Sequence, residues 1–132
     1  MQKVFSISGR VKIGLGRGAY FMGQKEYKAQ FIKKLGIDPY HGTLNVKLSP
    51  ANVLLLGKIR KRKGILVKGF RRDGKSFGDV LCYHADMSGI KCALVMPKKS
   101  THTQVAEIIS SQMLRAKLKL RDGSRVTVSV KA

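Results

Sequence analysis

The sequence has few cysteines and histidines and lacks long hydrophobic runs, and these absences exclude several classes of protein. Its two cysteines, Cys82 and Cys92, do not form a CxxC pair, and its three histidines are scattered. Neither a disulfide framework nor a zinc site is indicated, so we expect two reduced, structural thiols. The longest apolar runs, at 53–56 and 93–96, are too short to span a bilayer, and the N-terminus lacks a signal-peptide hydrophobic segment. We therefore expect a cytoplasmic protein that does not enter membranes.

Acidic residues are scarce as well, with 7 Asp and Glu against 27 Lys and Arg, a net charge of +20 and a pI near 10.5. Such a balance predicts an anionic partner. Nucleic acid is the usual one, but the phosphates of nucleotides and flavins satisfy the same electrostatics. The basic run at 58–63 is typical of a nucleic-acid patch or of a solvated loop, and it contains no aromatic residue on which a base could stack.

The length and the hydrophobic content indicate a single domain covering 1–132. A chain of 132 residues, 43% of them hydrophobic, is long enough to bury one continuous core. A four-residue period of apolar positions predicts an amphipathic helix at 24–35, with Gly36 as its C-cap. A short helix is expected at 114–118, whereas the rest of 105–120 has an ambiguous pattern.

Apolar and polar residues alternate with period two in several segments, which predicts strands. These segments are 5–13, 43–48, 65–70, 77–83, 90–96 and 126–130, with a turn at Asp73-Gly74. Many short strands without regular βαβ alternation favour a mainly β fold. We expect a closed or nearly closed β-barrel with one or two short helices.

The first candidate binding segment combines alternate glycines with an arginine. Gly14, Gly16 and Gly18 remove side chains from a strand-to-loop junction, so backbone N–H groups there can approach phosphate oxygens. Arg17 could add a charge-assisted hydrogen bond. The segment is neither a Walker A nor a Rossmann motif, because GK[ST] is absent and the glycine spacing differs. A flexible connection at a barrel corner remains the alternative.

The second candidate is the strand at 43–48. Leu44, Val46 and Leu48 would point inward, so Thr43 and Asn45 would present two neutral oxygens about 7 Å apart on the outer face. Such ligands suit Mg²⁺ that is held mainly by water and substrate phosphates. An ordinary amphipathic strand explains the same pattern.

The third candidate runs from 96–103 through Glu107 to 112–115. Ser100 and Thr101 follow two lysines, which fits a phosphate site and equally fits a routine loop after proline. Acidic residues are few, and once those with turn or ion-pair roles are set aside, Glu107, Asp79 and Asp86 are the candidates for chemistry or ligand recognition. Of these, only Glu107 lies close to another candidate segment.

Taken together, these stretches resemble the archaeal CTP-dependent riboflavin kinase family. The resemblance rests on GLGRGAYF, PYHGTLNVKL, and VMPKK followed by a histidine, EII and LR, and it covers 14–48 and 93–132 closely. It implies a compact, six-stranded Greek-key barrel of the cradle-loop type. It also implies that riboflavin is phosphorylated to FMN, with CTP as the donor and Mg²⁺ between the adjoining sites.

The resemblance also implies roles for single residues. Magnesium would be held by Thr43 and Asn45, and the flavin by Glu107 and by Ser100. The loop after His102 is one residue shorter than the family pattern, so Thr101 could replace Ser100. As a hypothesis, Glu107 orients the acceptor hydroxyl and assists its deprotonation. The nucleotide would contact Gly14, Leu15, Gly16, Arg17, Gly18 and Ala19, and again Gln112, Met113, Leu114 and Arg115.

Two other functions remain open at this point. A non-enzymatic, nucleic-acid-binding barrel would explain the net charge and the run at 58–63 but leaves the paired Thr43 and Asn45 without a role. A flavin or nucleotide carrier would keep the pocket without turnover. We expect a monomer that binds riboflavin or FMN and CTP or CDP. Nucleic acid is a further partner that the basic surface would allow.

Overall fold

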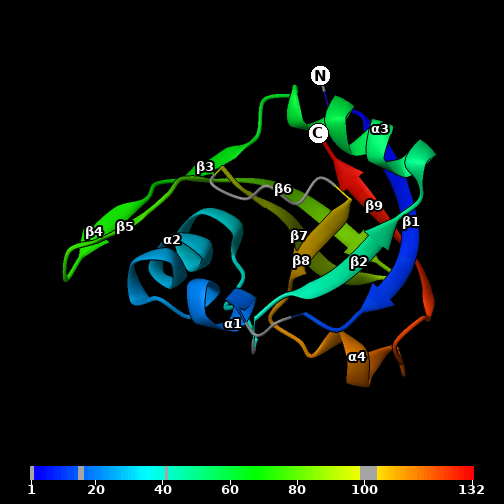
Figure 1. The fold of residues 1–132 in the computed structure, drawn as a ribbon. Helices are drawn as coiled ribbons and strands as arrows, with labels where there is room; N and C mark the ends of the chain where they lie inside the picture. The colour runs from blue at the N-terminus through cyan, green and yellow to red at the C-terminus, as the bar shows by residue number, and fades with distance from the viewer. Residues whose placement is uncertain (1, 15–16, 41, 99–103) are drawn as a thin grey trace.

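Six antiparallel strands close into a β-barrel (Figure 1). The structure is a computed structural model, and it describes residues 2–14, 17–40, 42–98 and 104–132. The strand order is β6-β7-β8-β2-β1-β9, and β9 pairs back with β6 at Ala85↔Val130 and Asp86↔Ser129. The barrel strands are β1 (Val4–Lys12), β2 (Leu44–Leu48), β6 (Val80–Met87), β7 (Ile90–Pro97), β8 (Val105–Ile109) and β9 (Arg125–Lys131).

The barrel has Greek-key connectivity. Strands β6, β7 and β8 are consecutive antiparallel neighbours, and β9 returns to lie beside β6 after the connection through 110–124. The order β9-β6-β7-β8 is the Greek-key arrangement of four strands. The predicted six-stranded Greek-key barrel is confirmed.

Alternation of side chains builds the barrel core. In β2, Leu44, Val46 and Leu48 are buried, whereas Lys47 is exposed and Asn45 is half-buried on the other face. The inward-facing residues of the other barrel strands join them in one hydrophobic cluster. The predicted orientation of β2, with its leucines and valine inward, is confirmed.

Two helices close the ends of the barrel. Helix α3 (Pro50–Arg60) contributes Leu56 and Ile59 to the core at one end, and α4 (Leu114–Lys117) contributes Leu114 at the other. Helix α3 was not predicted, because its apolar residues form a continuous run instead of a helical period. The basic run at 58–63 is the end of this helix and the turn after it.

A second hydrophobic cluster lies outside the barrel. Helices α1 (Arg17–Met22) and α2 (Lys25–Leu35) bury Met22, Tyr27 and Phe31 against the outer face of β6, β7 and β8. The predicted helix at 24–35 is confirmed, and Gly36 ends it at φ 69°. The described residues form four helices, where one or two were expected. None of these helices is long and apolar enough to cross a membrane.

The predicted turn at Asp73-Gly74 is confirmed, but the flanking strands are interrupted. Strands β4 (Phe70–Arg72) and β5 (Lys75–Phe77) form a separate two-stranded sheet that projects from the barrel, while β3 (Ile65–Val67) pairs with β6 (Figure 1). The Gly69 N–H donates to Asp79 Oδ1 at 2.7 Å where the sheets separate. A side chain at Gly69 would meet the Phe77 carbonyl oxygen at 2.1 Å, so this close approach requires glycine.

Both cysteines are buried in the packed interior and free of disulfides. Burial raises the pKa of Cys82 and that of Cys92 to about 12. At pH 8 about one thiol in 10⁴ is then a thiolate, and only the thiolate reacts readily. We expect no reaction of the native protein with Ellman's reagent over hours and release of two equivalents after addition of guanidinium chloride. Labelling of the native protein at the rate of free cysteine would contradict this burial.

Candidate functional site

A row of polar side chains crosses three adjoining strands on the outer surface of the barrel. Asn45 of β2 lies opposite Lys12 of β1 on one side and opposite Glu107 of β8 on the other. Residues that lie directly opposite on neighbouring strands share a face, with Cβ atoms about 4.5–5.5 Å apart. Because Leu44 and Val46 point into the core, this row points outward. The fold therefore brings Asn45 and Glu107 side by side.

The glycine segment reaches the same place. Gly14 follows the end of β1, and a Cβ atom built on it would lie 2.2 Å from Asn45 Nδ2. No side chain fits between the two, so glycine lets the backbone pass directly over the Asn45 amide. Gly14, Asn45 and Glu107, which were predicted from three separate segments, are neighbours in the structure. Thr43 is half-buried immediately before β2.

The segment after β8 lies beside the residues that lead into β2. The Tyr40 N–H donates to the Ser110 carbonyl oxygen at 2.9 Å, and the Asp38 N–H donates to Ser111 Oγ at 2.9 Å. Gln112 and Met113 come next and are exposed. They are available to a ligand at this end of the barrel, close to the start of β2.

The last two predicted nucleotide contacts have partners within the protein. The Leu114 side chain is buried in the barrel core, so only its backbone could meet a ligand. The Arg115 guanidinium donates to Asp122 Oδ1 at 2.8 Å. This ion pair is partly exposed, and its contribution to stability is small.

The remaining predicted site residues lie in helix α1 or outside the described residues. Arg17, Gly18 and Ala19 belong to α1, so the predicted glycine loop ends in a helix. Leu15, Gly16, Ser100 and Thr101 lie outside the described residues.

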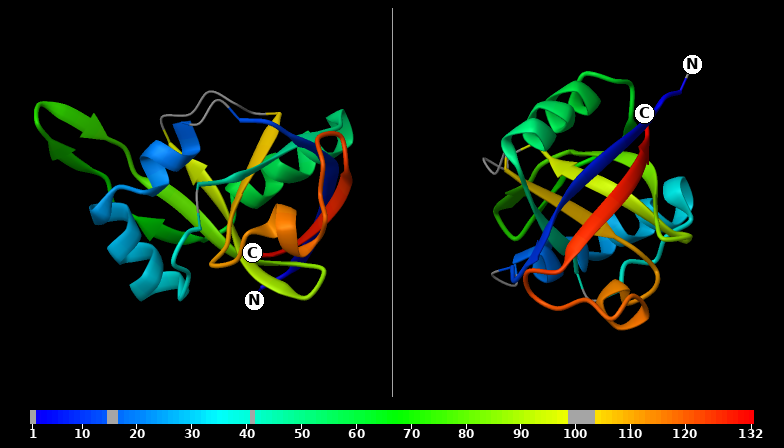
Figure 2. Two further views of the ribbon diagram at one scale, coloured as in Figure 1. Left: turned by 90° about the horizontal axis from the view of Figure 1, so that it is seen from below. Right: turned by 90° about the vertical axis from the view of Figure 1, so that its right-hand side faces the viewer.

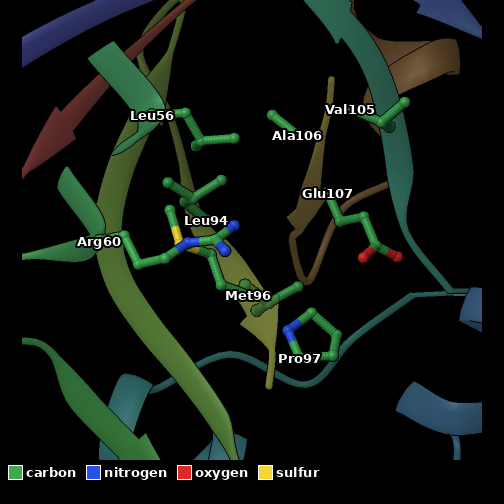
Figure 3. A pocket seen from close by; sticks show the side chains of 9 residues that line it. Leu56, Arg60, Leu94, Met96, Pro97, Val105, Ala106 and Glu107 are labelled. Atoms are coloured by element: carbon green, nitrogen blue, oxygen red, sulfur yellow. The ribbon is translucent and has the colours of Figure 1, made fainter. Parts of the chain in front are cut away.

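A shallow pocket adjoins Glu107 (Figure 3). It lies where α3 meets the ends of β7 and β8, and its empty space of about 250 Å³ includes open solvent. Two charged residues line it: the Arg60 side chain reaches in from α3, whereas the Glu107 side chain extends from β8 away from Arg60. The remaining walls are largely apolar and are formed by Leu56, Leu94, Val95, Met96, Pro97, Val105 and Ala106. Apolar walls with a few polar groups are typical of small-molecule sites.

Sequence reasoning missed two residues of this region. Lys12 lies beside Asn45; alternation predicts its place on the polar face of the strand, but nothing in that pattern connects it with Asn45. Arg60 was treated as part of a basic run, and no local pattern connects it with Glu107. Its place depends on the packing of α3 against the barrel.

The positive charges of Lys12 and Arg60 favour an anionic ligand in this region, and such a ligand can itself bring oxygen atoms for a metal ion. Within the described ranges, no group of three or more His, Cys, Asp or Glu side chains could hold a metal ion. A divalent cation at this site would therefore depend on neutral oxygens such as those of Thr43 and Asn45, and on oxygens of the ligand itself.

Comparison with known proteins gives consistent matches over most of the chain. The sequence model of the family CTP-dep_RFKase, described as domain of unknown function DUF120, matches residues 11–130. A riboflavin kinase of Thermoplasma acidophilum is 44% identical over 124 residues, which are 94% of this chain and 56% of the relative. One from Ignicoccus hospitalis is 40% identical over 131 residues, 98% of this chain and 73% of the relative. The chain spans little more than half the length of the Thermoplasma relative.

Proposed function

This chain belongs to the CTP-dependent riboflavin kinase family, and we propose that it transfers the γ-phosphate of CTP to the 5′-hydroxyl of riboflavin, giving FMN and CDP. The observation that carries the proposal is the convergence of Gly14, Asn45 and Glu107 on one outer patch beside an apolar pocket. A phosphoryl donor, a cation and an acceptor would have to meet in such a place. The choice of CTP over other nucleotides follows from the family, and no described residue explains it.

We assign Mg²⁺ to Thr43 and Asn45. Their hydroxyl and amide oxygens are hard, neutral donors, and both residues are half-buried and therefore partly accessible. These donors fit an ion that takes most of its ligands from phosphates and water. When bound, Mg²⁺ neutralises charge on the phosphates.

The two substrates are assigned to opposite sides of Asn45. Backbone N–H groups of 14–19 would bind the phosphates of CTP, with Gln112 and Met113 close to the nucleoside. The flavin ring would lie in the pocket, with Ser100 or Thr101 near its phosphate-accepting end. Glu107 belongs to both the pocket and the polar row, so it is suited to hold the riboflavin 5′-hydroxyl facing the donor.

Phosphoryl transfer requires positioning and charge stabilisation more than covalent chemistry by the protein. In the proposed reaction, the 5′-oxygen forms a bond to the γ-phosphorus while the bond to the bridging β-phosphate oxygen breaks. The hydroxyl proton passes to the Glu107 carboxylate and then to solvent, and CDP leaves with the bridging oxygen. We place the reaction in the cytoplasm.

One incubation distinguishes the proposed function from its rivals. The protein is mixed with riboflavin, Mg²⁺ and one of CTP, ATP, GTP or UTP, and FMN is measured by chromatography with fluorescence detection. We expect FMN with CTP and little with the other nucleotides. A nucleic-acid-binding barrel gives no FMN and no flavin binding, and a carrier binds flavin without forming FMN. Either of these results would reject the kinase.

Gly14→Ala is expected to lower kcat/KM for CTP by about 10–100-fold, because small displacements of positioning groups have effects of this size. The added methyl group would displace the Asn45 amide, which is the end of a side chain and can move. The melting temperature should therefore change little. The control is Gly57→Ala, since a Cβ atom at Gly57 meets nothing within 4 Å. Equal kcat/KM for both variants would contradict a role for the Gly14–Asn45 contact.

A further inference from the structure

Three positive side chains stand in one row on the outer face of β2, β1 and β9. Arg10 of β1 lies directly opposite Lys47 of β2 and directly opposite Arg125 of β9. All three are exposed. Neighbouring strands are about 4.8 Å apart, so three cationic side chains start within about 10 Å of one another.

This arrangement disfavours folding. Like charges directly opposite each other on neighbouring strands are destabilising. The ion pairs that the described residues form involve Lys28, Arg72 and Arg115, and none involves the row. Arg10 donates from Nη1 to the Gly123 carbonyl oxygen at 3.0 Å, which orients its guanidinium but does not neutralise it. Among the described residues, no ion pair relieves the repulsion; Glu107 lies diagonal to Lys47 on the same face, and Asp122 precedes Gly123.

The basic run at the end of α3 differs in this respect. Lys58 and Arg60 occupy the last turn of a helix, where cations interact favourably with the helix dipole. Local structure therefore accounts for these two cations. It does not account for the row on the strands.

The surroundings of the row are polar and open. Lys12 and Arg121 add exposed cations on one side, and Ser8 and Thr127, whose hydroxyl oxygens are 2.9 Å apart, lie on the other. In the right-hand view of Figure 2, β1 and β9 lie side by side across the front, with α3 at the upper left and α4 below. We call this surface, formed by Lys12, Arg10, Lys47, Arg125, Arg121, Ser8 and Thr127, the cationic face.

We propose that the cationic face binds the phosphate backbone of nucleic acid without regard to sequence. Lys, Arg, Ser and Thr side chains are the groups that contact phosphates in such complexes, and no aromatic residue belongs to the face, so bases are not stacked. The face extends about 13 Å along β1, from Ser8 to Lys12, and about 10 Å across the neighbouring strands β2 and β9. A membrane surface fits less well, because the face has no apolar row to insert.

The test compares two double variants that each remove two positive charges. Lys47→Gln/Arg125→Gln alters the cationic face and keeps Arg10, whereas Lys25→Gln/Lys33→Gln alters exposed lysines of α2 that form no ion pair with described residues. Binding to a short fluorescent DNA duplex of arbitrary sequence is measured by anisotropy between about 50 and 200 mM salt. Vesicles containing phosphatidylserine serve as a second anionic surface.

For five phosphate contacts, the slope of log K against log salt is expected to be about −4.5, and about −2.7 after the change on the cationic face. The duplex affinity of that variant should fall by about 10-fold or more at low salt, while its melting temperature rises by about 1–4 °C as repulsion is relieved. The α2 variant should keep the original slope. Equal slopes for the two variants, or binding to vesicles but not to the duplex, would overturn the proposal. FMN formation is followed in parallel, and its presence or absence does not affect this outcome.

Discussion

Replacing Glu107 with glutamine is expected to lower kcat for FMN formation by about 10²–10⁴-fold, the range of a general acid–base contribution. Glutamine has the same shape and keeps a neutral acceptor oxygen, but it can no longer take up a proton at that position. Glu107 lies on the outer face of β8 and is half-buried, so the barrel core does not depend on its charge. We expect the KM for riboflavin to rise less than kcat falls.

The matched control for this substitution is Asp86→Asn. It makes the same change from acid to amide on another barrel strand, and the Asp86 oxygen that accepts the Gly89 N–H at 3.0 Å can be retained by asparagine. Its kcat should equal that of the unchanged protein. Steady-state kinetics with varied riboflavin and varied CTP, together with melting curves, measure all three proteins. Unchanged turnover and flavin affinity in Glu107→Gln would remove Glu107 from the site.

The sequence predicted the elements whose patterns are local. Alternation located β1, β2 and β9, and the four-residue period located α2, because each of these buries one regular face. Strand β8 remained ambiguous, since its final residues Ile108 and Ile109 are both buried, one in each hydrophobic cluster. Helix α3 was missed for a similar reason, because its apolar residues form a run that follows no helical period.

The candidate site was predictable in its parts but not in its assembly. Residue type and alternation placed Asn45 on the outer face, and the family resemblance gave it and Glu107 their roles. Their pairing depends on the register between β2 and β8, and the contact of Gly14 with Asn45 depends on where the chain passes after β1. These are properties of the closed barrel. No spacing within the sequence encodes the approach of Arg60 to the pocket.

Gly9→Ala is expected to destabilise the protein by about 3 kcal/mol and to lower the melting temperature by about 10 °C. Gly9 lies in β1 between Leu48 of β2 and Val126 of β9, and its φ is not positive. The requirement is steric: a Cβ atom there would lie 2.2 Å from the Lys47 carbonyl oxygen and 2.8 Å from Val46 Cγ1. Because the first of these atoms is backbone, strand β2 itself would have to move.

A comparison with Gly57→Ala distinguishes two explanations for a loss of stability: the close backbone approach at Gly9, and a general intolerance of alanine at glycine positions. Gly57→Ala adds the same methyl group to a helix position where it meets nothing, and helix propensity predicts a gain of about 1 kcal/mol. Thermal and denaturant unfolding of both variants therefore give shifts of opposite sign. A Gly9→Ala protein as stable as the unchanged one would mean that β1 and β2 can separate at Gly9 without loss. The register that brings Lys12, Asn45 and Glu107 together would then be less firmly fixed than these contacts indicate.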